Sequence, residues 1–338
     1  MTDTIAPGLI TGVALTLLGG ILAGICMLPM KFPKRLQWEN TWLLFSLVAL
    51  LFLPWALAGI LVPNLPNVYG ALPARAFLAP VAFSAGWGVA QVLFGLSVAR
   101  LGVALAYAII IGLGTVLGTL VPLFVKAGQV VGTWRGMLIF AGIAVMVAGI
   151  AVSAWAGRMR ERAASAAAAQ SYGGALALAV LCGLLAPMLN YAFAFGESIA
   201  AAAVRHGASA TMAVYAVWPV ALLGGLVVNV AYSAWLLSRN RTWGRYRQAW
   251  RSEAWSGCLM GILWMAAMAV YGVSSVYLGA LGTSVGWALF QIFMIMTANL
   301  SGVLTGEWAQ APPAARRRLW FGLALLASAT IVIALGNR

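Results

Sequence analysis

Ten long apolar stretches constrain the fold of this chain more than any other feature. Each is about 20 residues long, the length an α-helix needs to cross about 30 Å of hydrocarbon. Hydrophobic residues make up 63% of the 338 residues and charged residues 8%, a composition too apolar for a soluble fold around one core. The apolar runs are continuous, unlike the short alternating segments of an outer-membrane barrel. The sequence therefore predicts an all-α membrane protein with ten transmembrane helices.

The predicted spans cover residues 8–28, 42–62, 77–98, 103–125, 136–155, 173–195, 213–237, 255–277, 283–304 and 319–335. No Lys or Arg precedes Lys31, so we interpret the first stretch as a span rather than a secretory signal peptide.

The ten spans divide into two halves of five. We predict a first repeat at residues 1–157, a linker at residues 158–171 and a second repeat at residues 172–338. Shifting the third span by 177 residues places Trp87 on Trp264 and Gly95 on Gly272, and a weaker match places Gly20 on Gly183. Because five is odd, the second half must enter the bilayer inverted. Inverted repeats are typical of secondary transporters.

The basic residues predict the orientation of the chain. Of the 20 Lys and Arg residues, 15 fall in the odd-numbered loops, which the positive-inside rule assigns to the cytoplasm. Both termini are then expected in the periplasm. These 15 residues are Lys31, Lys34, Arg35, Arg100, Arg158, Arg160, Arg162, Arg239, Arg241, Arg245, Arg247, Arg251, Arg316, Arg317 and Arg318.

A basic and aromatic cluster at residues 239–251 admits two interpretations. Its interleaved Trp243, Tyr246 and Trp250 could stack on nucleic-acid bases, or the segment could anchor on anionic lipid at the membrane surface. In a chain this apolar we expect lipid as the partner and no nucleic acid.

The acidic residues do not indicate an enzyme. The chain has six Asp and Glu, and none is at the centre of a predicted span. There is no Ser-His-Asp order, no HExxH motif, no Gly-rich phosphate loop and no Cys pair with metal-ligand spacing. We therefore expect no catalytic residues, no metal and no cofactor. A membrane enzyme or a scaffold remains the non-transport alternative.

The polar groups inside the spans are neutral amides, hydroxyls and indoles, which suit an uncharged polyol better than an ion. A sugar offers hydroxyls to amides and an apolar C–H face to an aromatic ring. Trp87 and Gln91 share one helix face, as do Trp264 and Tyr271. The alternative is that these aromatics anchor at the interface or pack in the bundle. The candidate substrate-binding residues are Trp87, Gln91, Asn190, Trp264, Tyr271, Trp287 and Gln291.

Proton coupling requires a group that titrates while facing the site, and intramembrane acids are the default candidates. Glu39 precedes the second span, where it could instead favour a helix N-terminus or neutralise Lys34 and Arg35. Glu197 follows the sixth span and would lie nearer the midplane if that helix continued through residues 200–203. Glu39 and Glu197 are the candidate proton-coupling residues.

Several segments resemble the L-rhamnose proton symporters of the drug/metabolite transporter superfamily. They include residues 36–43 (LQWENTWL), residues 87–91 (WGVAQ), the stretch 112–122, Trp264 with Tyr271, Trp287, and Glu307-Trp308. The resemblance extends over almost the whole chain. It implies a bacterial inner-membrane symporter that imports a deoxyhexose such as L-rhamnose, or L-lyxose, with a proton.

The chain departs from that family pattern at three positions. A family glutamine falls on Ala267, a histidine on Phe290, and an amide position holds Gln91 rather than Asn. These departures leave open a different sugar. The other transport alternative is an exporter of neutral metabolites or amino acids from the same superfamily.

Overall fold

The computed structural model describes residues 7–101, 103–164 and 172–336, and within them every regular element is helical. Ten segments of the described chain are long and apolar enough to cross a membrane, which confirms the predicted number of spans. The main helices are α1 (Pro7–Ile25), α2 (Trp38–Ser46), α3 (Leu53–Leu61), α4 (Leu65–Gly70), α5 (Arg75–Leu101), α6 (Val103–Lys126), α7 (Trp134–Ala164), α8 (Tyr172–Leu185), α9 (Met188–Ala194), α10 (Glu197–Arg205), α11 (Ala210–Ala213), α12 (Trp218–Arg239), α13 (Arg245–Tyr277), α14 (Val285–Leu304) and α15 (Pro313–Gly336).

The sixth span is discontinuous, whereas the sequence predicts one helix at residues 173–195. It consists of α8, α9 and α10, with breaks at residues 186–187 and 195–196. Pro187 sits at the first break, where its missing N–H prevents the helical hydrogen-bond ladder from continuing. The segment between the breaks is α9, a helix of seven residues.

Two other boundaries differ from the prediction because turns that contain charged residues extend the helix beyond its apolar run. The eighth span begins at Arg245 rather than at residue 255, because α13 includes a polar first part that hydropathy does not detect. Similarly, α7 runs to Ala164 and so includes part of the predicted linker. The remaining linker residues, 165–171, lie outside the described chain.

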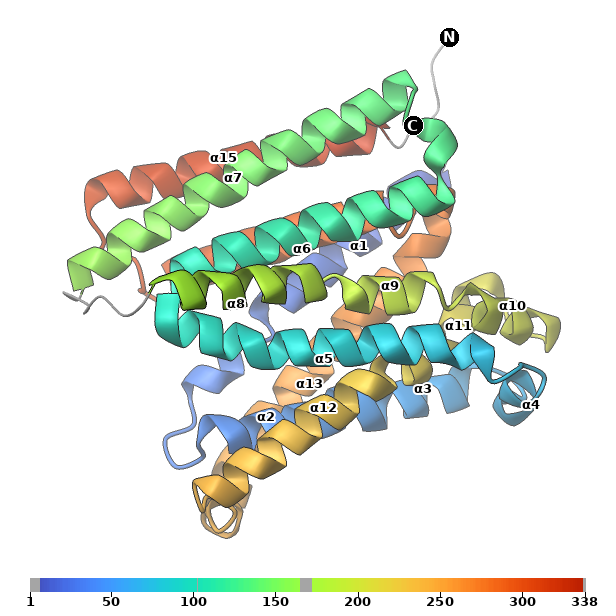
Figure 1. The fold of residues 1–338 in the computed structure, drawn as a ribbon, viewed down its shortest axis with the longest axis horizontal. Coiled ribbons are helices and arrows are strands. Elements are labelled where there is room, and N and C mark those ends of the chain that lie inside the picture. Colours follow the sequence, from blue (N-terminus) through green and yellow to red (C-terminus); the bar gives the residue numbers. More distant parts are fainter. Residues whose placement is uncertain (1–6, 102, 165–171, 337–338) are drawn as a thin grey trace.

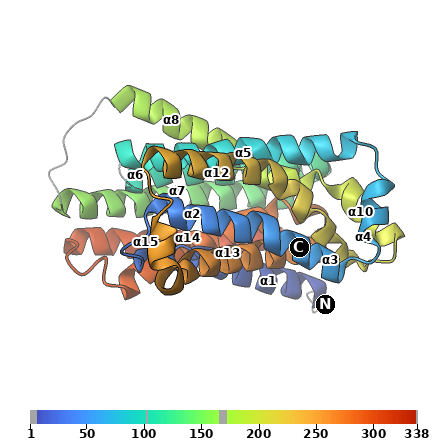
Figure 2. The same ribbon diagram turned by 90° about the horizontal axis from the view of Figure 1, so that it is seen from below.

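The helices run largely along the long axis of the molecule, and α1 begins at the same end at which α15 finishes (Figure 1). We call this end, with the even-numbered loops, the outer end, and the opposite end the inner end. The helix α1 packs against α13 and α14, α8 packs against α5 and α6, and α12 packs against α5 and α2. Helices α7 and α15 form a pair along one flank (Figures 1 and 2).

Glycines let α7 and α15 approach closely. A Cβ added at Gly322 would lie 2.3 Å from Ser153 Oγ and 2.9 Å from the Ser153 backbone nitrogen. At Gly149, an added Cβ would lie 3.1 Å from the Gly322 carbonyl oxygen. Helices in lipid have no hydrophobic driving force for association. Small residues at such crossings allow the close van der Waals packing that holds the helices together instead. The seam between the two helices therefore requires glycine at both positions.

A Gly322→Val substitution should separate these two helices. We expect it to lower the free energy of unfolding by about 1–3 kcal/mol, the usual cost of overpacking. Gly112→Ala is the matched control, because a Cβ at Gly112 meets no atom within 4 Å. Thermal unfolding in detergent measures both variants. Equal melting temperatures for Gly322→Val and the parent would contradict the close packing described here.

Candidate functional site

Two tryptophans from opposite halves of the chain meet in the centre of the bundle. The rings of Trp87 on α5 and Trp264 on α13 stack with centroids 5.6 Å apart and planes 22° from parallel. Both side chains are buried, and Phe45 lies edge-on to Trp264. Gly225 on α12 leaves room for this pair, since a Cβ there would lie 2.7 Å from the Trp87 ring.

The Asn190 side chain on α9 connects three other parts of the bundle. Its Nδ2 donates to the carbonyl oxygen of Gly118 on α6, at 3.0 Å, and to that of Thr283, at 2.8 Å. Its Oδ1 accepts a hydrogen bond of 2.6 Å from the Tyr271 hydroxyl on α13. Asn190 is 1% exposed and Tyr271 is fully buried. The structure therefore brings these two predicted site residues into direct contact.

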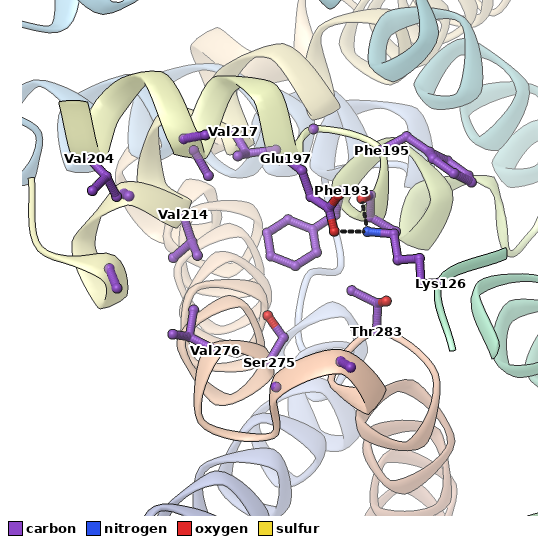
Figure 3. A pocket seen from close by; sticks show the side chains of 18 of the residues that line it. Lys126, Phe193, Phe195, Glu197, Val204, Val214, Val217, Ser275, Val276 and Thr283 are labelled. Carbon is purple, nitrogen blue, oxygen red and sulfur yellow. Dashed lines mark hydrogen bonds and ion pairs between the residues drawn. The ribbon is translucent and has the colours of Figure 1, made fainter. Parts of the chain in front are cut away.

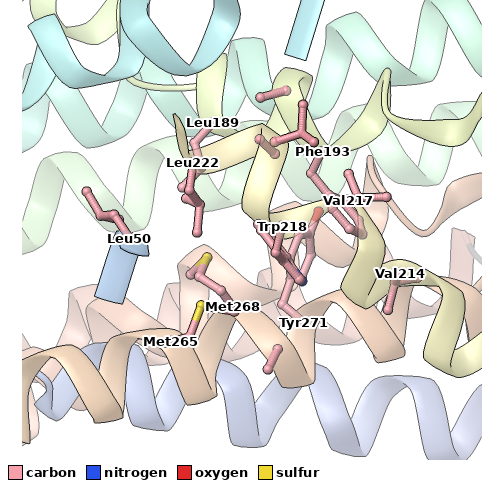
Figure 4. Close-up of a cluster of buried hydrophobic side chains, with 14 of the residues drawn as sticks. Leu50, Leu189, Phe193, Val214, Val217, Trp218, Leu222, Met265, Met268 and Tyr271 are labelled. Carbon is pink, nitrogen blue, oxygen red and sulfur yellow. The ribbon is translucent and has the colours of Figure 1, made fainter. Parts of the chain in front are cut away.

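Two indole N–H groups beside this contact have no hydrogen-bond partner within the described chain. They belong to Trp287, stacked on Phe290, and to Trp218, stacked on Phe193 at 4.6 Å. Tyr271 contacts rings of both stacks: Phe193 of one, beside which Figure 4 shows it, and Trp287 and Phe290 of the other. A buried donor left unpaired costs about 1–3 kcal/mol, so unpaired donors near a cavity are suited to bind an incoming acceptor. Trp287 belongs to the predicted substrate-binding set. Trp218 is one of the indoles inside the predicted spans but is outside that set, and Phe193 is not among the predicted site residues.

The predicted glutamines lie one helical turn from the predicted tryptophans. Gln91 follows Trp87 on α5 and is half-buried, and Gln291 follows Trp287 on α14 and is buried. Because Trp264 and Tyr271 are two turns apart on α13, this helix connects the stacked tryptophans to the Asn190 contact. We name the region formed by Trp87, Trp264, Tyr271, Asn190 and Trp287 the central chamber.

A cavity of about 630 Å³ lies at the outer end, and the size is within the range of ligand pockets. Phe193, Val217, Ser275 and Thr283 are among its lining residues (Figure 3). Phe193 stacks on Trp218, and the Thr283 carbonyl oxygen accepts from Asn190. The outer cavity therefore borders the side chains of the central chamber.

Glu197 lies at the edge of this outer cavity, at the first residue of α10, and this helix continues through residues 200–203. Its side chain is 76% exposed and forms an ion pair with Lys126, the last residue of α6. The Lys126 ammonium also donates to the Ala194 carbonyl oxygen and lies 5.7 Å from the centre of the Phe195 ring (Figure 3). Lys126 is not among the site residues predicted from the sequence, although it directly follows the fourth predicted span.

Glu39 lies at the inner end, in the first turn of α2, and is 6% exposed. Its Oε1 accepts hydrogen bonds from Asn240 Nδ2, at 3.0 Å, and from Thr242 Oγ1, at 2.9 Å. These contacts join α2 to the segment between α12 and α13. The structure thus places Glu39 and Glu197, the two candidate coupling residues, at opposite ends of the molecule.

A second charged cluster holds the inner end together around Glu307. Its carboxylate pairs with Lys31, and its Oε2 lies 3.3 Å from an Arg160 nitrogen. The Arg160 guanidinium carbon is 4.7 Å from the centre of the Trp308 ring. Glu307 also lines an inner cavity of about 230 Å³, together with Glu161 and Arg160.

The Lys31 hydrogen bond, together with the positive charges of Lys31 and Arg160, holds the pKa of Glu307 below its ordinary value. A carboxyl whose pKa is lowered in the folded state stabilises the fold above its ordinary pKa of about 4.3. That contribution is lost as the pH falls through the lowered value. Glu307 is partly exposed, so solvent screening makes the effect small.

Glu307→Gln should therefore reduce the melting temperature at pH 7, and the difference from the parent should shrink as the pH falls below about 4.3. Differential scanning fluorimetry between pH 3 and pH 8 measures the difference. Glu253→Gln is the control, because it removes a carboxylate that accepts hydrogen bonds from the Arg35 and Leu36 backbone and takes no part in the ion pairs of Glu307. A Glu307→Gln deficit that is the same at every pH would contradict the assigned ion pairs.

Comparison with known proteins places the chain among transporters. A family model described as "L-rhamnose-proton symport protein (RhaT)" matches residues 5–337. A protein of Pectobacterium carotovorum subsp. carotovorum named L-rhamnose-proton symporter is 26% identical over 337 residues, covering 97% of this chain and 98% of the relative. A protein of the same name from Cronobacter sakazakii is 25% identical over 334 residues, covering 96% and 97%. One from Yersinia pestis is 25% identical over 337 residues, covering 97% and 98%.

Proposed function

Because this chain belongs to the L-rhamnose-proton symport family, we propose that it imports L-rhamnose or a related deoxyhexose or pentose together with a proton. The protein is a proton-coupled sugar transporter of the bacterial inner membrane and not an enzyme. The exporter alternative is not favoured, because the family and the relatives described above are symporters.

We infer that transport proceeds by alternating access between two inverted repeats. The packing of the helices supports this inference, since every main contact has a counterpart in the other half. The contacts of α1 with α13 and α14 correspond to those of α8 with α5 and α6, and the contact of α5 with α12 corresponds to that of α13 with α2. Helix α7 packs on its own counterpart α15.

Individual residues support the same repeat. Trp87 and Trp264, which the sequence offset superposes, stack on each other, as residues on a two-fold axis would. Gly20 and Gly183 also correspond. A Cβ at Gly20 would lie 2.8 Å from the Phe290 carbonyl of α14, and one at Gly183 would lie 3.2 Å from the Ile109 carbonyl of α6. Each glycine thus allows the equivalent helix crossing in its own half.

The observation that carries the substrate assignment is the central chamber beneath the outer cavity. In this structure its side chains pack against one another. When they separate to admit a sugar, the indoles would offer flat apolar faces to its C–H groups, and Gln91, Gln291 and the unpaired indole N–H groups would offer hydrogen bonds to its hydroxyls. We propose Trp87, Gln91, Trp264 and Tyr271 as the principal substrate residues, with Asn190, Trp287 and Gln291 completing the set.

The departures from the family pattern support a modified sugar preference. Ala267 and Phe290 both lie close to Gly19 of α1, since a Cβ at Gly19 would lie 3.2 Å from the Ala267 backbone carbonyl oxygen and 3.3 Å from the Phe290 ring. Two positions that are polar in the family pattern, Ala267 and Phe290, are thus apolar in this chain and lie near each other. We propose that fewer hydroxyls are recognised there, so sugars that differ from L-rhamnose at one hydroxyl are the next candidates.

Uptake of labelled L-rhamnose into proteoliposomes with an acidic exterior tests the function. We expect accumulation that a protonophore abolishes. Gln91→Ala and Trp264→Phe should each raise the half-saturating concentration about tenfold, the effect of losing one hydrogen bond or stack worth roughly 1.4 kcal/mol. Trp320→Ala, at an exposed tryptophan of α15, is the control. Unchanged saturation in both chamber variants of folded protein would overturn the substrate assignment.

We propose that either Glu39 or Glu197 carries the coupled proton. Replacing the coupling residue by glutamine should abolish accumulation driven by a pH gradient, while exchange of labelled for unlabelled sugar across the membrane continues. Glu39→Gln and Glu197→Gln are therefore assayed side by side in both modes. If each variant keeps full gradient-driven accumulation, the proton is carried elsewhere.

A further inference from the structure

Two charged clusters join equivalent helix ends at opposite ends of the molecule. At the inner end, Lys31 closes the 3-10 turn Leu28–Lys31 that follows α1, and it pairs with Glu307, which follows α14. At the outer end, Glu197 begins α10 after the break that ends α9, and it pairs with Lys126, which ends α6. In the proposed repeat, α1 corresponds to the sixth span and α14 corresponds to α6. The two ion pairs therefore link the same pair of helices in each half, with the charges exchanged.

The two clusters also share a common design. In each, the residue from the α6 or α14 end has two partners. Lys126 binds the Glu197 carboxylate and the Ala194 carbonyl oxygen. Glu307 binds Lys31 and Arg160. Removing Lys126 or Glu307 therefore breaks two contacts, and removing Glu197 breaks one. Removing Lys31 breaks its ion pair with Glu307 and a hydrogen bond of 3.3 Å to Thr305 Oγ1.

Each cluster borders the cavity at its own end. Lys126 and Glu197 line the outer cavity, and Glu307 and Arg160 line the inner cavity. Helix ends that are tied together at a cavity edge limit how far that cavity can widen. Partly exposed ion pairs are weak, which suits contacts that must break once in every transport cycle.

We propose that the Lys126–Glu197 pair and the Lys31–Glu307–Arg160 cluster are the outer and inner gate contacts of the transport cycle, each opening while the other stays closed. This assignment rests on the proposed alternating-access function. Both contacts are formed in this structure, as they are in an occluded state between the two open states. Lys126, Lys31, Glu307 and Arg160 are thereby gating residues that position helix ends and do not touch the sugar.

Cysteine accessibility tests the assignment without sugar and without a pH gradient. The native Cys26, Cys182 and Cys258 are first replaced by alanine. Ser275→Cys then reports on the outer cavity and Ala298→Cys reports on the inner cavity, because these residues line them. The rate of labelling by a membrane-impermeant maleimide is measured for each reporter, with the detergent-solubilised protein exposing both ends.

Glu307→Gln should raise labelling at Ala298→Cys and lower it at Ser275→Cys, and Lys126→Met should do the opposite. We expect the ratio of the two rates to change by roughly two- to fivefold, as the strength of a partly exposed ion pair allows. Glu197→Gln should act in the same direction as Lys126→Met but more weakly, and Lys31→Gln should act in the same direction as Glu307→Gln. If Glu307→Gln or Lys126→Met does not fold, Lys31→Gln or Glu197→Gln is measured in its place.

Lys34→Gln and Arg205→Gln are matched controls, since each removes one positive charge near a cluster without removing a gate residue. They should leave the ratio of labelling rates unchanged. Inner and outer variants that move the ratio in the same direction, or not at all, would overturn the proposal. Opposite shifts in a protein that fails to take up L-rhamnose would support the gates while refuting the proposed substrate.

Discussion

The hydrogen bonds of the Asn190 amide are the interaction on which the centre of the molecule depends. In lipid, a buried polar group requires a partner inside the protein if an energetic cost is to be avoided, because no water is present to replace that partner. Asn190 meets this requirement by joining α9 to α6, to Thr283 and to Tyr271. The short α9 segment is thereby held between two helix breaks, directly beneath the outer cavity. Tyr271, which donates its hydroxyl to Asn190, in turn contacts the rings of Phe193, Trp287 and Phe290.

The distribution of charge complements this neutral centre. The chamber itself is formed by amides, hydroxyls and rings. In the part of the chain that the structure describes, the carboxylates that form ion pairs or hydrogen bonds through their side chains lie towards the two ends of the molecule. A neutral chamber avoids the cost of desolvating an ion and leaves recognition to hydrogen bonds and ring faces. Charged contacts at the ends can then hold or release the helix ends without disturbing the chamber. This division of roles fits a transporter whose cargo is uncharged and whose driving ion is a proton.

Hydropathy predicted the ten spans, because the length of a continuous apolar run is set by the bilayer. It failed at the breaks of the sixth span and at the start of α13, where local hydrogen bonding and charged turns decide the boundary. Helical spacing predicted which chamber residues share a face, but contacts such as Trp42 Nε1 to Asn229 Oδ1, at 2.8 Å, join residues 187 positions apart. Likewise, no local pattern indicates that Glu39 meets Thr242 or that Glu197 meets Lys126. Pairing across the bundle is a property of the packed fold.

The central claim is that sugar and proton enter together through the chamber at Asn190. The most direct measurement is the pH of a weakly buffered, sodium-free medium around de-energised vesicles when L-rhamnose is added. We expect a transient alkalinisation of the medium that is absent with Asn190→Ala and absent in the presence of a protonophore. Entry of labelled sugar without any change in external pH would contradict proton symport by this protein.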